Sequence, residues 1–119
     1  MKLTIHKINN ISLAALEAAD HAIANVQDTL DLIANADYQG ARKIMIKKEH
    51  LHPDFFDLKT RLAGEMLQKF VNYYMKLAVI GDFSEYQSKN FRDFMYESNK
   101  AGQIFFAGTV DEAIKHLTR

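Results

Sequence analysis

The fold is decided by residues 54–82, which read DFFDLKTRLAGEMLQKFVNYYMKLAVIGD. From Leu58 to about Tyr74, apolar residues recur at the three- and four-residue spacing of an amphipathic helix, with Asp57 as the predicted N-cap. Leu77–Ile80 follows as a short strand that is apolar on both faces, as buried parallel strands are. A helix that leads directly into such a strand is half of an α/β repeat. The stretch therefore predicts an α/β fold.

The same alternation continues on both sides of this stretch. Strands are predicted around residues 3–5, 11–16, 44–46, 77–80 and 104–106, with a hairpin turn at Asn9–Asn10 and helix N-caps at Asp20, Asp57, Ser88 and Thr109. The order β-β-α-β-α-β-α-β-α predicts one α/β domain over residues 1–119, with a mostly parallel five-stranded sheet. Right-handed crossovers between neighbouring strands would place the helices mainly on one face of that sheet. The other face is predicted to be open, because Lys43 and Lys47 flank Met45 there.

Composition excludes some classes of function. The 119 residues include 15 basic and 15 acidic side chains, and a neutral chain lacks the charge expected of a nucleic-acid binder. Such a role would require Arg42, Lys43, Lys47 and Lys48 to form one continuous basic face. The chain has no cysteine, which removes disulfides and thiolate chemistry. We found no signal-peptide core and no apolar run long enough to span a bilayer, so we expect a cytoplasmic protein without membrane contact.

Several short motifs resemble a known family. These are DFFDL (54–58), AGE (63–65), LQKF (67–70), NY (72–73), VIGDFS (79–84), ESN (97–99) and IFF (104–106). Together they resemble the signature of a bacterial family known as domain of unknown function 4180, over nearly the whole chain. The resemblance implies no particular activity, since none is established for that family.

The order of elements is also similar to that of the domain shared by sulfate transporters and anti-sigma-factor antagonists. That resemblance implies a small, non-enzymatic, partner-binding fold. Its phosphorylation motif, Asp-Ser-Ser-Gly, corresponds in position to Asp54-Phe55-Phe56-Asp57 of this chain. Because two phenylalanines stand where the hydroxyls belong, the resemblance extends to the fold and not to the phosphorylation switch.

Open parallel sheets bind ligands outside the carboxyl ends of their strands. The loops expected there carry acidic and hydroxyl side chains, and the start of the second helix adds free N–H groups and a guanidinium. A small ligand, if one binds, is therefore expected at Asp54, Asp57, Thr60, Arg61, Asp82 and Ser84. The alternative interpretation is that these residues cap the helix and order the loops.

The segment His50-Leu51-His52-Pro53-Asp54 suggests a second kind of site. Imidazole nitrogens and a carboxylate are ligands for zinc or manganese. His50, His52 and Asp54 are therefore candidate metal ligands, provided that the loop is extended. The alternative is a polar surface loop anchored by Leu51 and Phe55.

The sequence contains no catalytic constellation with a known mechanism. It favours a non-catalytic protein-binding or regulatory module that needs no cofactor and that binds itself, as a homodimer, or another protein. The predicted interface lies on the open sheet face, with Ala14, Met45 and Phe105 at its centre. The alternative function is a small metal-assisted hydrolase that uses the acidic and histidine residues at the strand ends.

Overall fold

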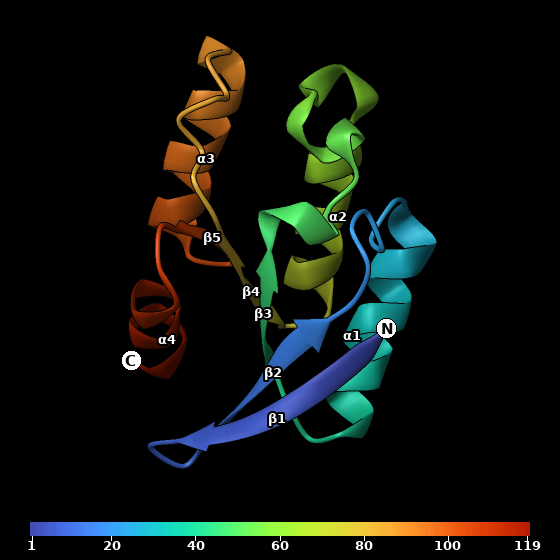
Figure 1. Ribbon diagram of the computed structural model, residues 1–119, viewed down its shortest axis with the longest axis vertical. Coiled ribbons are helices and arrows are strands. Elements are labelled where there is room, and N and C mark those ends of the chain that lie inside the picture. The colour runs from blue at the N-terminus through green and yellow to red at the C-terminus, as the bar shows by residue number, and fades with distance from the viewer.

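The computed structural model describes residues 1–119 as one α/β domain built on a five-stranded sheet (Figure 1). The strands are β1 (Lys2–Ile8), β2 (Ile11–Glu17), β3 (Lys43–Lys47), β4 (Lys76–Ile80) and β5 (Ile104–Ala107). The helices are α1 (Val26–Tyr38), α2 (Leu62–Asn72), α3 (Lys89–Ala101) and α4 (Val110–Thr118). Neighbouring strands follow chain order, with β1 antiparallel to β2 and all other pairs parallel. The predicted fold class is confirmed.

Helices α1, α2 and α3 cover the first face of the sheet. A core of 22 buried residues lies between these helices and the strands, and Phe70, Phe91 and Leu32 are among the largest helical side chains fully buried in it. Strand residues at alternate positions complete it, such as Ile44 and Ile46 on β3. Alternate side chains point to opposite faces, so the residues between them belong to the second face.

Helix α4 lies on the second face, across β4 and β5. Its Ala113 and Leu117 pack on a smaller core of six buried residues, in which Ala78 and Ala107 leave room for a close helix. The right-handed crossover rule applies to a helix between two strands. Because no strand follows α4, that rule does not place it with the other helices. The face that the sequence predicted to be open is therefore partly covered.

Two of the three predicted interface residues, Ala14 and Met45, do not lie on an exposed sheet face, while an interface at Phe105 remains a prediction. Ala14 is fully buried on the first face, among the residues under the helices. Met45 belongs to the core beneath α4 and is 8% exposed. Phe105 is partly buried and stacks on His116 of α4, with ring centroids 4.0 Å apart. The side-chain alternation of β2 puts Leu13 and Ala15, and not Ala14, on the second face.

Lys43 explains why a lysine is compatible with a covered face. Its Nζ donates to the backbone oxygen of Leu117, at 2.5 Å, near the end of α4. The last carbonyls of a helix have no partner within the helix, and a cation beside them is favourable. Burial, together with the nearby Lys76, lowers the pKa of Lys43. This lysine therefore holds the end of a helix rather than marking a solvent-exposed face.

Two helices begin later than predicted. Asn25, and not Asp20, caps α1: its Oδ1 accepts the N–H of Asp28 at 2.8 Å. The segment before it is extended, because the N–H of Ile23 donates to the carbonyl of His50. Helix α2 begins at Leu62, since Leu58–Thr60 forms a separate 3-10 turn and Arg61 has a φ of 67°. The predicted caps Ser88 and Thr109 and the Asn9–Asn10 turn are confirmed.

The two edges of the sheet are finished differently. At β5, the side-chain amide of Asn99 accepts the N–H of Phe106 at 2.7 Å and donates to its carbonyl at 3.2 Å. The amide thus occupies the place of a neighbouring strand at that residue. At the opposite edge, β1 carries exposed Lys2 and Lys7, and lysines on an edge strand discourage further pairing. Helices α1 and α3, the longest at 13 residues each, fall well short of a bilayer span.

Candidate functional site

The carboxyl ends of β2, β3, β4 and β5 lie together at one end of the sheet, because these strands are parallel. The segments that follow these strand ends hold all of the predicted ligand and metal residues. Their hydrogen bonds show how each polar group is used.

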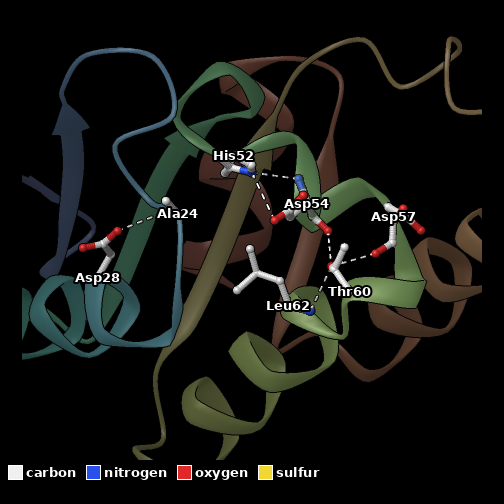
Figure 2. Close-up of polar contacts among 7 residues, drawn as sticks. All are labelled: Ala24, Asp28, His52, Asp54, Asp57, Thr60 and Leu62. Carbon is white, nitrogen blue, oxygen red and sulfur yellow. Dashed lines mark hydrogen bonds and ion pairs between the residues drawn. The ribbon is translucent and has the colours of Figure 1, made fainter.

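Asp54, Asp57 and Thr60 are engaged with one another around the 3-10 turns before α2 (Figure 2). The hydroxyl of Thr60 lies 2.5 Å from the carbonyl oxygen of Asp54 and 2.8 Å from that of Asp57, and it accepts the N–H of Leu62. A carboxylate oxygen of Asp57 accepts the N–H of Lys59. Arg61 supplies a left-handed backbone position, and its carbonyl accepts the first hydrogen bond of α2. These groups order the entry to the helix.

Asp82 and Ser84 form a similar local turn after β4. The Oδ1 of Asp82 accepts the N–H of Ser84 at 3.0 Å, and this backbone hydrogen bond is the main reason why the pKa of Asp82 lies below its usual value. The structure therefore gives Asp82 and the Thr60 turn the loop-ordering role that was the alternative interpretation. A ligand at these six residues remains a prediction.

The predicted metal site is wrong. The Nδ1 of His50 accepts the backbone N–H of Lys47, and the side chain is buried. The Nδ1 of His52 accepts the backbone N–H of Asp54 and lies 3.6 Å from its carboxylate (Figure 2). Three histidine or carboxylate groups do not converge anywhere in the chain in a way that could hold a metal ion. The 3-10 turns on both sides of Leu51 fold a loop that would have to be extended for His50 and His52 to point together.

A cleft with a volume of about 310 Å³ lies at this carboxyl end of the sheet. None of the six predicted ligand residues lines it. Its charged side is formed by Lys48, Glu49 and Glu85, and its apolar side by Leu51, Pro53 and Phe56, with His21 and Tyr86 completing it. The sequence did not single out this cleft. In the sequence, Lys48 is one of several lysines around β3, and no local pattern links it to Glu85, which is 37 residues away.

The ionisable groups of the cleft form a tight network. The Nζ of Lys48 donates to the backbone oxygen of Asp82 and to Oε1 of Glu85, both at 2.7 Å, and lies 5.7 Å from the centre of the Tyr86 ring. The hydrogen bond between the two side chains raises the pKa of Lys48 and lowers that of Glu85. Burial raises the pKa of Tyr86. At neutral pH the lysine and glutamate remain charged and the tyrosine neutral.

The four basic residues of the nucleic-acid alternative do not form one face. Arg42 lies at the amino end of β3, where its Nη1 is 2.6 Å from the carboxylate of Asp37. Lys43 is bound to α4, and Lys48 lies beyond the carboxyl end of β3, paired with Glu85. The condition for a continuous basic surface is not met.

Three exposed tyrosines, which we call the tyrosine patch, lie in the segments at the amino end of the sheet: Tyr38 at the end of α1, and Tyr73 and Tyr74 directly after α2. These side chains are 91%, 51% and 82% exposed. Arg42 joins the two segments that carry them, because it pairs with Asp37 at the end of α1 and donates to the backbone oxygen of Tyr73. A groove of about 370 Å³ runs beside it, lined by Leu30, Ala34 and Tyr73 among others.

Comparison with known proteins gives the family. The model of the family described as "Domain of unknown function (DUF4180)" matches residues 8–117, which is nearly the whole chain. The chain is an α/β domain and belongs to this family. No curated protein and no solved structure matches it.

Proposed function

We propose that this chain is a non-catalytic protein-binding module and that the tyrosine patch is its binding surface. The observation that carries the proposal is that two segments with three exposed tyrosines are joined by one arginine at the amino end of the sheet. Tyrosine and arginine are the side chains most enriched at the energetic centres of protein interfaces. Tyrosine also buries a large area while fixing only two side-chain torsions.

The Lys48–Glu85–Tyr86 network in the cleft at the carboxyl end supports a binding role over a catalytic one. An acid or base that works at neutral pH has a pKa near neutrality. The shifts at Lys48, Glu85 and Tyr86 all lead away from it. We therefore propose a regulatory or partner-binding role, with either a second copy of this chain or another protein as the partner.

The test compares matched tyrosine variants. Tyr38→Ser combined with Tyr74→Ser removes two rings of the patch, and Tyr96→Ser removes another exposed tyrosine (64%), on α3. Self-association is measured by sedimentation up to high micromolar concentration. Binding of other proteins is measured by cross-linking in an extract of the source cells, followed by mass spectrometry.

We expect a complex that the double variant weakens more than tenfold and that Tyr96→Ser leaves intact, because truncating one central tyrosine costs about 2 kcal/mol. Thermal unfolding should be the same for all three proteins, since these rings are exposed. A complex that the double variant retains in full, or the absence of any complex, would overturn the proposal.

A further inference from the structure

Lys48 is held at the cleft by more than its salt bridge. Its side chain is 18% exposed, and the carbonyl of Asp82 accepts one of its N–H groups. Gly81 makes this position possible: a Cβ at that residue would lie 2.7 Å from Cγ and Cδ of Lys48. The Asp82 carbonyl and the space left by Gly81 therefore help to position the ammonium group, in addition to Glu85.

Glu85, by contrast, is exposed. Its side chain is 60% exposed, and it belongs to the segment between β4 and α3, which forms neither helix nor strand. An exposed carboxylate gains little from a salt bridge in water, whereas a largely buried ammonium group requires a counter-ion. The lysine is thus the fixed member of the pair and the glutamate the exchangeable one.

We propose that Glu85 occupies the position of an external anion, and that the cleft binds a small carboxylate with an apolar body whose carboxylate replaces that of Glu85 on Lys48. The volume of about 310 Å³ is at the lower end of small-molecule sites. Leu51, Pro53 and Phe56 provide an apolar wall for the body of such a ligand.

The charges in the cleft favour replacement over addition. Glu49 also lines it, so an anion that entered beside Glu85 would place three carboxylates around one ammonium group. Replacement keeps the number of charges constant. For the same reason the site favours a singly charged carboxylate over a phosphate, and its apolar wall offers no further donors for phosphate oxygens.

The test is a chemical-shift titration of the ¹⁵N-labelled chain with benzoate, acetate and inorganic phosphate as probes. The variants are Glu85→Gln, which removes the competing charge, and Lys48→Met, which removes the cation. Lys47→Met is the matched control, because Lys47 is the neighbouring lysine and is exposed. Gly81→Ala is a further variant that displaces Lys48 without changing any charge.

We expect benzoate to bind the unmodified chain weakly and Glu85→Gln about tenfold more tightly, with shifts at residues 48–56 and 81–86. Acetate should bind less tightly and phosphate least. Lys48→Met and Gly81→Ala should lose saturable binding, while Lys47→Met should keep it. Equal affinity in Lys48→Met and Lys47→Met, no gain in Glu85→Gln, or no saturable shift with any probe would overturn the proposal. The tyrosine patch lies at the other end of the strands, so neither outcome affects the proposed function.

Discussion

The two faces of the sheet differ in how they are covered. Three helices that connect successive strands bury the first face over a core of 22 residues, whereas one terminal helix covers part of the second over a core of six. The helices of the first face are fixed at both ends by strands. Helix α4 is fixed by β5 at one end and at the other by the contacts of Lys43 and His116. Chain connectivity therefore secures one face, and a few specific contacts secure the other.

The largest expected effect tests the first face. Phe70→Ala should lower the free energy of unfolding by about 3–5 kcal/mol, because it removes a fully buried aromatic ring and leaves a cavity. Urea denaturation measures the loss. An unchanged midpoint would show that α2 does not belong to the main core.

A substitution in the core of the second face should lower the free energy of unfolding by less. Leu117→Ala should lower the free energy of unfolding by about 2–3 kcal/mol, at the low end for a buried leucine, because the end of a terminal helix can relax into the space. The same urea experiment measures this loss. A loss as large as that of Phe70→Ala would remove the distinction between the two faces.

A smaller effect is expected at the end of α4. Lys43→Met should cost about 1 kcal/mol, since it removes the hydrogen bond to the carbonyl of Leu117. The desolvation that lowers the pKa of Lys43 offsets part of the gain from that bond. Lys47→Met is the control, as an exposed lysine on the same strand. Equal midpoints for the two variants would mean that Lys43 does not hold the helix.

The smallest expected effect is a dependence on pH. His116 has one nitrogen 3.0 Å from the carbonyl of Gly102 and the other 3.2 Å from a guanidinium nitrogen of Arg119. Burial lowers its pKa; the hydrogen bond to Gly102 opposes this shift, and Arg119, Lys76 and Lys43 add to it. The unfolded chain therefore takes up the proton at a higher pH than the folded one. Stability should be constant above the ordinary histidine pKa of about 6.5 and decrease as the pH falls below it.

The measurement is the urea midpoint at about pH 7.5 and about pH 5.5, on either side of that value. His116→Gln should reduce the difference between the two midpoints. It should not abolish the difference, because burial also lowers the pKa of His50, which lies at the opposite end of β3. A pH dependence that is the same in the variant and the unmodified chain would show that α4 does not respond to protonation.

Local patterns predicted most of the fold. Strand alternation, the Asn9–Asn10 turn and the caps Ser88 and Thr109 depend on residues within a few positions of one another. The wrong predictions arose where contacts between residues that are distant in the sequence decide the local conformation. Ile23 has helical spacing with Val26, but its pairing with Leu51 holds it in an extended conformation.

The candidate sites also depend on contacts that no local pattern in the sequence indicates. Thr60 lies where a helix start was predicted, and its contacts with Asp54 and Asp57 form a separate turn instead. The cleft requires Lys48 to cross over Gly81 and reach Glu85, and no spacing in the sequence records such a contact. The tyrosines of the patch are visible in the sequence, but their exposure is not.

The amide of Asn99 has a consequence for how copies of this domain could join. Growth of a continuous fibre by edge-to-edge stacking requires two free edges on every subunit, so that each newcomer offers a fresh template. Asn99 already occupies the outward-facing groups of Phe106 at the β5 edge. Pairing through β5 would have to displace this amide, so a pair formed through β1 of both partners would leave at each end a β5 edge that is capped at Phe106. One side-chain amide thus disfavours the addition of a further copy at the β5 edge.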